Sequence, residues 1–121
     1  MKGLRILVVE DTMLVADAIA ELLAMAGVVV VGPVGRVEPA KALAQCEALD
    51  GALLDVNLDG EDSGPIADVL RARGIPFIFL TGYNDPAALL PQFRNAPRLT
   101  KPVREGDLKR EIVSRFGVVA G

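Results

Sequence analysis

The sequence predicts an α/β fold in which helices cover both faces of a parallel sheet. Short apolar runs alternate with segments whose apolar residues repeat every three or four positions, an alternation typical of βα units. The runs at residues 4–9 and 76–80 are apolar nearly throughout, which is typical of strands buried on both faces. With 121 residues and no linker or repeat, we expect a single domain, residues 1–121, around one core.

Five strands and five helices are predicted along the chain. The apolar runs place strands at residues 4–9, 28–31, 52–56, 75–80 and 99–100. The helical spacing places helices at residues 14–26, 38–48, 66–73, 84–93 and 108–116. Gly27 provides a stop for the first helix, and Pro91 truncates or distorts the fourth. Residues 32–35 and the Asp- and Gly-rich residues 57–64 are predicted as loops.

Composition excludes several classes of function. The net charge of -3 argues against a nucleic-acid surface, and no apolar stretch reaches the roughly 18 residues of a membrane span. The amino terminus lacks the layout of a cleavable signal, so we expect a cytoplasmic location. The absence of histidine removes His-dependent catalysis and any role as a phosphohistidine carrier. Cys46 is alone and is expected to be a small core residue.

Polar residues close four of the predicted strands. Glu10 and Asp11 follow the first, Asp55 ends the third, Thr81 follows the fourth and Lys101 follows the fifth. Open parallel sheets build their sites at the carboxyl ends of strands, so these side chains are expected to converge. Clustered carboxylates repel one another unless a cation binds, and Mg²⁺ prefers such oxygen ligands. A carboxylate can also act as the nucleophile in phosphoryl transfer.

Each of these residues also has an ordinary structural interpretation. Asp11 precedes a helix and is a candidate N-cap, and Asp55 is a candidate for an Asx turn. Thr81 before Gly82 is a common turn pair, and a single Lys101 is most often a solvated charge. Together, however, their order at successive strand ends favours one shared site.

Four segments carry a resemblance to a known family. They are residues 6–11 (ILVVED), 53–58 (LLDVNL), 79–83 (FLTGY) and 99–102 (LTKP). With them the whole chain resembles the receiver domain of two-component response regulators, and in particular a stand-alone subgroup with a Phe-x-Thr-Gly-Tyr signature. The resemblance implies a doubly wound, flavodoxin-like (βα)5 fold with strand order 2-1-3-4-5. It also implies a phosphoacceptor signalling domain rather than an enzyme, partnered by a histidine kinase or phosphotransfer protein.

The resemblance further implies a role for each site residue. Asp55 would accept the phosphoryl group. Mg²⁺ would be bound directly by Asp11, Asp55 and the backbone carbonyl of Asn57, with Glu10 acting through water. Thr81 and Lys101 would contact the phosphoryl group, and the bond between Lys101 and Pro102 would be cis.

One departure from the family pattern concerns the conformational switch. The family usually carries Tyr or Phe three residues before the lysine, where this chain has Arg98. The usual approach to the fifth strand is likewise replaced by residues 93–97 (FRNAP). We therefore expect the usual coupling of Thr81 to that aromatic to be altered, with Tyr83 a candidate to replace it. The alternative is that Tyr83 is a partly buried loop aromatic without a switching role.

Alternative functions stay open at this stage. A protein-interaction module that is never phosphorylated is one, although the complete set of site residues counts against it. A second is that the chain is the receiver fragment of a longer response regulator. Since no output domain follows the last predicted helix, we expect signalling through a downstream protein partner, which the sequence leaves unidentified, or a role as a phosphate sink.

Overall fold

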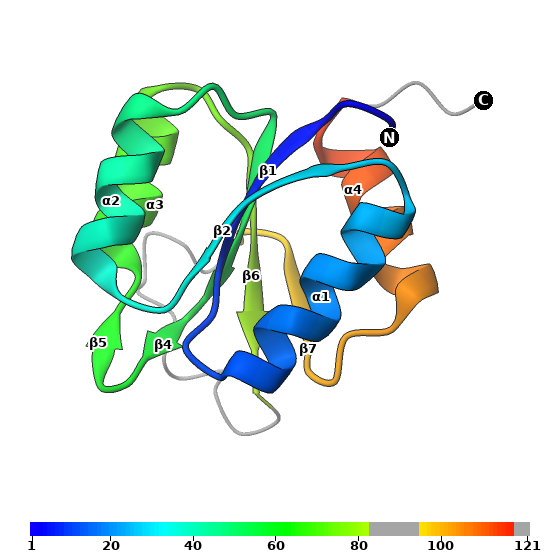
Figure 1. Ribbon diagram of the computed structural model, residues 1–121. Helices are drawn as coiled ribbons and strands as arrows, with labels where there is room; N and C mark the ends of the chain where they lie inside the picture. The colour runs from blue at the N-terminus through cyan, green and yellow to red at the C-terminus, as the bar shows by residue number, and fades with distance from the viewer. Residues whose placement is uncertain (83–94, 118–121) are drawn as a thin grey trace.

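The computed structural model describes residues 1–82 and 95–117, and within them a five-stranded parallel sheet forms the centre of the molecule (Figure 1). Its strands are β1 (Arg5–Val9), β2 (Val29–Val34), β3 (Gly51–Asp55), β6 (Phe77–Thr81) and β7 (Arg98–Thr100). Their spatial order is β2-β1-β3-β6-β7, which is the order 2-1-3-4-5 in sequence terms. The predicted fold class is confirmed.

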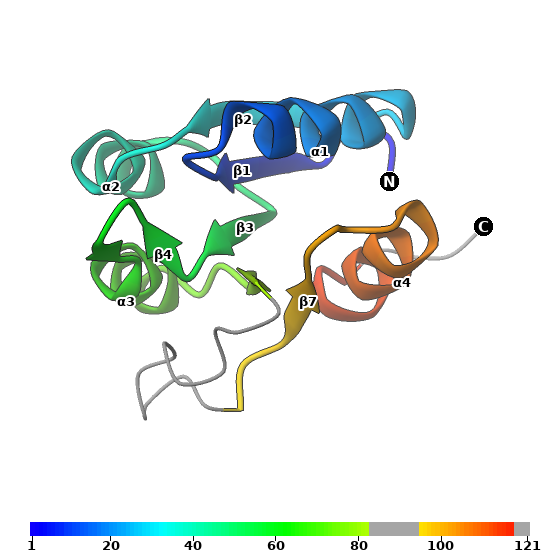
Figure 2. The same ribbon diagram turned by 90° about the horizontal axis from the view of Figure 1, so that it is seen from below.

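Helices cover both faces of this sheet. The described helices are α1 (Met13–Met25), α2 (Val37–Cys46), α3 (Gly64–Ala72) and α4 (Glu105–Arg115). Figures 1 and 2 show α1 and α4 on one side of the sheet and α2 and α3 on the other. The helix predicted at residues 84–93 lies outside the described residues.

Alternating strand residues divide the core between the two faces. In β1, Leu7 and Val9 pack with α2 and α3, whereas Ile6 and Val8 pack with α1 and α4. All four side chains are fully buried, as the continuous apolar run predicted. Because the pleat sends successive side chains to opposite faces, one uninterrupted apolar run supplies both halves of the core.

Strand β2 is longer than predicted. Gly32, Pro33 and Val34 belong to the strand rather than to a loop. The strand lies at the edge of the sheet, where proline is tolerated because its missing N–H removes no ladder hydrogen bond. The pairing with β1 shifts register between Leu7 and Val9, which accommodates the Gly-Pro pair.

The predicted loop at residues 57–64 contains a small hairpin. Strands β4 (Asn57–Leu58) and β5 (Glu61–Asp62) pair antiparallel. Asp59 and Gly60 connect them with φ of 50° and 88°, and a positive φ at both central residues is the mark of a type I′ turn. The acidic residues Asp59, Glu61 and Asp62 are exposed.

Two further interpretations of single residues are wrong. Asp11 is not the N-cap of α1, because the helix begins at Met13 and Thr12 therefore takes that position. Cys46 is exposed at the end of α2 instead of buried in the core. The buried stripe of that helix runs through Val37, Ala40 and Ala44, and Cys46, two positions beyond Ala44, faces away from it.

Candidate functional site

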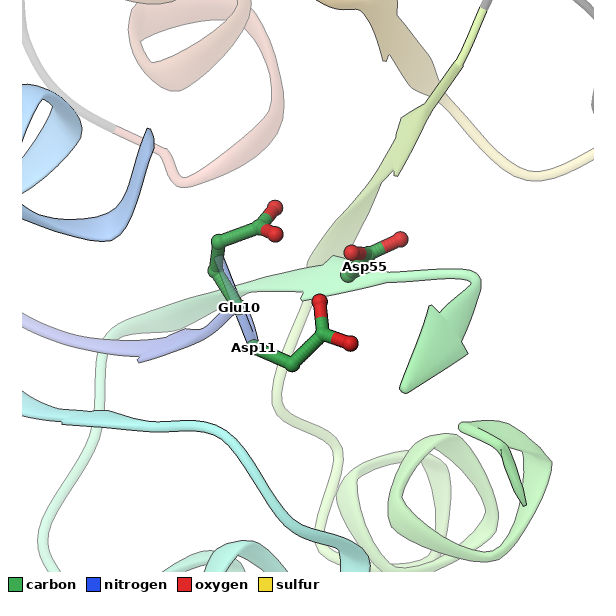
Figure 3. Close-up of side chains that lie close together, drawn as sticks. All are labelled: Glu10, Asp11 and Asp55. Carbon is green, nitrogen blue, oxygen red and sulfur yellow. The ribbon is translucent and has the colours of Figure 1, made fainter. Parts of the chain in front are cut away.

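Three carboxylates meet where β1 and β3 end. Glu10, Asp11 and Asp55 each offer a carboxylate oxygen, and these oxygens all lie within 4.8 Å of one another. Figure 3 shows the three side chains gathered at the ends of the two neighbouring strands. The parallel pairing of β1 with β3, with Val9 beside Leu54, brings the residues that follow Val9 next to Asp55. Glu10 and Asp55 are buried, while Asp11 is exposed.

Lys101 is held between two of these carboxylates. Its Nζ atom lies 2.9 Å from Glu10 Oε2 and 2.9 Å from Asp55 Oδ2. The Lys101 N–H donates to the Thr81 carbonyl at 2.8 Å, which fixes the lysine at the end of β6 and β7. The Lys101–Pro102 peptide bond is cis. The prediction that the strand-end residues converge is therefore confirmed for Glu10, Asp11, Asp55 and Lys101.

Burial dominates the electrostatics of Glu10. The pKa of its carboxyl is raised to about 7, mainly by desolvation and in smaller part by the neighbouring Asp55, while Lys101 and the Thr12 N–H oppose the shift. The Thr12 N–H donates to Glu10 Oε1 at 3.1 Å. Burial alone would lower the pKa of Lys101, but its hydrogen bonds to Asp55 and Glu10 outweigh that effect and raise it.

The donor set fits a small divalent cation. Glu10 Oε2 is buried and, among the described residues, accepts no hydrogen bond of good geometry, although it is close to Lys101 Nζ. Three carboxylates beside one ammonium leave net negative charge in a partly buried space, which favours cation binding. Hydrated Mg²⁺ takes one or two carboxylates directly and suits such an arrangement.

Asp55 also forms the Asx turn that was its alternative interpretation. The Asn57 N–H donates to Asp55 Oδ1 at 3.1 Å, and Asn57 Oδ1 accepts from the Gly60 N–H at 3.0 Å. These bonds hold Asn57 at the edge of the carboxylate cluster and orient Asp55. Asp55 therefore belongs both to the Asx turn and to the carboxylate cluster.

Thr81 is buried at the end of β6. Its hydroxyl donates to the Leu99 carbonyl at 3.5 Å, the upper limit for a hydrogen bond, so this contact holds the side chain only weakly. The residue before it, Leu80, is in register with Asp55. Arg98 is exposed on β7, and Tyr83 lies outside the described residues.

A cavity beside Asp11 was not predicted from the sequence. A cavity of about 630 Å³ is lined by Asp11, Gly35 and Arg36 together with Leu58, Asp59 and Glu61 of the hairpin. A Cβ atom on Gly35 would lie 3.0 Å from Asp11 Cα, so glycine permits this close approach of the loop after β2. The only local sign of this cavity in the sequence was Gly35, within the loop predicted at residues 32–35.

Comparison with known proteins identifies the family. The family model for the response regulator receiver domain matches residues 6–113. The chain therefore belongs to the response regulator receiver domain family, as the resemblance indicated. Receiver domains act in two-component signalling with a histidine kinase and are not conventional enzymes.

Solved structures agree with this assignment. The chain is similar to SdrG from Sphingomonas melonis Fr1, with 37% identity, a TM-score of 0.84, and 96% of this chain and 98% of that chain covered. A BeF3-activated structure of SdrG is matched with 36% identity and a TM-score of 0.76, covering 94% and 98% of the two chains. These two structures place the chain close to a stand-alone receiver.

A third similar structure contains a metal ion. It is the receiver domain of the sensor histidine kinase PA1611 from Pseudomonas aeruginosa PAO1, with magnesium coordinated in its active site cleft. It is 27% identical, has a TM-score of 0.78, and the match covers 96% of this chain and 99% of that chain.

One curated relative is a longer protein. The chain is 34% identical over 87 residues to the uncharacterized transcriptional regulatory protein YbdJ of Bacillus subtilis. The match covers 70% of this chain but 38% of that protein. None of the described helices is long and apolar enough to cross a membrane.

Proposed function

We propose that Asp55 is the phosphoacceptor of this receiver domain. The observation that carries the proposal is a carboxylate that is 3% exposed, ends β3, and has the Lys101 ammonium 2.9 Å away. In the transfer, an Asp55 carboxylate oxygen forms a bond to phosphorus while the bond from phosphorus to the donor breaks. The donor keeps the electron pair of that bond. The BeF3-activated form of the similar SdrG supports this assignment.

The proposal gives Lys101 and Thr81 supporting roles. Phosphoryl transfer depends mainly on positioning and on neutralising charge. Lys101 would exchange its ion pair with Asp55 for one with a phosphoryl oxygen, and it needs little movement because Asp55 itself carries the group. Thr81 would donate its hydroxyl to another phosphoryl oxygen, giving up the weak contact with the Leu99 carbonyl at 3.5 Å.

Magnesium is the proposed cofactor. Asp11 and Asp55 would hold it directly, together with the backbone carbonyl of Asn57, and Glu10 would act through a water molecule. When bound, the ion would supply positive charge for the oxygens of the incoming phosphoryl group. The magnesium in the similar PA1611 receiver supports this choice of metal, as do the three clustered carboxylates here.

We further propose a switch built on Thr81. Movement of its hydroxyl towards the phosphoryl group would be passed to Tyr83, two residues along the chain, and to the surface around Arg98. A bound group that favours one of two loop arrangements shifts the population of the surface beside it.

The proposed partners are proteins on both sides of the transfer. A histidine kinase or phosphotransfer protein would supply the phosphoryl group, and output would pass through contacts with a downstream protein, or the domain would act as a phosphate sink. The transcriptional role in the name of YbdJ belongs to a protein of which this chain matches 38%. The cytoplasmic location stays a prediction from the sequence.

Intact-mass measurement tests the proposed phosphoacceptor. Protein is incubated with acetyl phosphate and Mg²⁺, and the mass of wild type is compared with that of Asp55→Asn. We expect one added phosphoryl group in wild type, removable by hydroxylamine, and none in the variant. Asp62→Asn, which alters an exposed hairpin carboxylate, should be labelled like wild type. An unlabelled wild type would favour an interaction module that is never phosphorylated.

A further inference from the structure

A cavity lies beside Asp11, next to the proposed phosphoacceptor Asp55. Asp55 is 3% exposed and its carboxylate already contacts Lys101, so a donor needs an approach from an open side. The carboxylates of Asp11 and Asp55 lie within 4.8 Å of each other. Asp11 in turn lines a cavity of about 630 Å³, which is large enough for a small phosphorylated molecule.

The cavity is lined by one cation and three carboxylates, with Asp11 among the latter. One wall is the loop after β2, with the exposed Arg36 as its cation, and the other is the β4–β5 hairpin, with Asp59 and Glu61. The close approach of Gly35 to Asp11 sets the neighbouring Arg36 beside the carboxylate cluster. Arg36 and Glu61 also line a second cavity of about 300 Å³, together with Glu38 and Pro39.

Arg36 differs from the cation inside the site. Lys101 is paired with Glu10 and Asp55, whereas no ion pair or side-chain hydrogen bond reaches the Arg36 guanidinium from the part of the chain that the structure describes. An arginine presents several N–H donors in a planar fork suited to carboxylates and phosphates. Its side chain is thus available to a molecule in the cavity.

We propose that Arg36 is a specificity-determining residue that contacts the leaving group of the phosphodonor. This inference rests on the proposed phosphorylation of Asp55. As the bond from phosphorus to the leaving group breaks, the leaving group takes the electron pair. An acyl phosphate releases a carboxylate, which gains negative charge and is stabilised by the guanidinium. Phosphoramidate releases ammonia, which takes up a proton from solvent and gains no negative charge, so it benefits less.

The carboxylates of the hairpin should affect the transfer rate in the opposite direction to Arg36. Asp59 and Glu61 line the same cavity as Arg36, and their charges disfavour an anionic leaving group. Removing one of them should therefore speed transfer from an acyl phosphate, while removing the Arg36 charge should slow it. A merely structural role of these exposed residues would not produce opposite effects.

The test measures the initial rate of Asp55 labelling by intact mass, with Mg²⁺ present. Acetyl phosphate and phosphoramidate are each used on wild type, Arg36→Gln, Glu61→Gln and the control Arg110→Gln, an exposed arginine on α4. With acetyl phosphate, Arg36→Gln should be slowed about three- to fivefold, the size of an exposed charge interaction. Glu61→Gln should be about twofold faster, and Arg110→Gln unchanged. With phosphoramidate, Arg36→Gln should change less than twofold relative to wild type.

Each other outcome overturns the proposal. Equal slowing of Arg36→Gln with both donors would make Arg36 a general determinant of the site rather than of the leaving group. An unchanged Arg36→Gln, or the same change in Arg110→Gln, would remove Arg36 from the reaction. If neither donor labels wild type, the proposed function fails and this inference fails with it.

Discussion

Strands β1 and β3 carry one charged cluster at each end, and the two clusters behave differently. At the amino ends, Arg5 pairs with Glu47 at 3.1 Å, with side chains 38% and 41% exposed. Its N–H donates to Asp50 at 2.8 Å. At the carboxyl ends, Lys101 pairs with Glu10 and Asp55 at 2.9 Å, with carboxylate side chains 0% and 4% exposed.

Solvent explains the difference between the clusters. Water screens the amino-end pair, and an exposed pair of this kind contributes little to stability. In the carboxyl-end cluster the carboxylates of Glu10 and Asp55 are buried, and this burial is the main cause that raises the pKa of Glu10 to about 7. It also leaves a buried Glu10 oxygen without a well-aligned donor among the described residues. Similar residue types thus form a structural contact at one end of the sheet and a reactive site at the other.

Loss of magnesium binding is the largest difference that we expect between the two ends. Asp11→Ala should weaken Mg²⁺ binding at least about tenfold, because one of two direct carboxylates is removed. Asp50→Ala, at the amino end, should bind Mg²⁺ like wild type. Amide NMR titration or the Mg²⁺-dependent shift in melting temperature measures this. Wild-type affinity in Asp11→Ala would show that the ligand assignment is wrong.

Substituting one ion-pair partner in each cluster should change the free energy of unfolding more at the carboxyl end than at the amino end. Lys101→Met should slow labelling of Asp55 at least about tenfold, since the phosphoryl oxygens lose a fixed cation. Its free energy of unfolding should fall by about 1–3 kcal/mol, because two buried carboxylates lose their partner. Glu47→Gln should change stability by less than about 1 kcal/mol. Urea unfolding measures the free energy of unfolding of both variants. A Lys101→Met protein that does not fold would favour a structural role for Lys101.

The pH dependence of stability should separate the clusters in metal-free protein. The pKa of Glu10 is about 7, against an ordinary value of 4.5, so the folded protein holds a proton that the unfolded chain releases. This contribution to stability is complete below pH 4.5 and is lost as the pH rises through 7. Between those values, wild type should lose about 1–3 kcal/mol that Glu10→Gln does not lose.

Urea unfolding at pH 5 and pH 8 in EDTA measures this difference. Glu47→Gln, which alters the exposed cluster, should keep the wild-type dependence on pH. A Glu10→Gln protein with the wild-type pH dependence would show that another group binds the proton.

The smallest expected effect concerns how the carboxyl-end site communicates. Tyr83→Ala should leave Asp55 labelling within about twofold of wild type, because the side chain is not part of the proposed phosphoryl site. It should reduce the changes in amide NMR shifts that acetyl phosphate causes in β7 and α4. Identical changes in wild type and Tyr83→Ala would remove Tyr83 from the switch, and Arg98→Ala would be the next variant to compare.

Some predictions failed where the local pattern had a second interpretation. Asp59 and Gly60 are a strong signal for a two-residue hairpin, but the strands on either side have two residues each and show no apolar alternation. The Gly32-Pro33 pair indicated a loop, since its place at the sheet edge depends on the order of all five strands. Cys46 lies at the end of a helical pattern, where a shift of one or two positions around the helix decides whether the side chain points to the core or to solvent.

The sequence by itself determined the fold class and the polar residues that close four of the five strands. Apolar runs buried on both faces, and polar residues directly after them, are local patterns that survive any detail of packing. Tertiary structure alone decided which of these residues touch. The Lys101 contacts with Glu10 and Asp55 join residues 91 and 46 positions apart. The cavity lined by Arg36 and the hairpin likewise depends on the approach of Gly35 to Asp11. The pKa of Glu10 follows from the same packing, because burial depends on every element around a side chain and not on its neighbours in the chain.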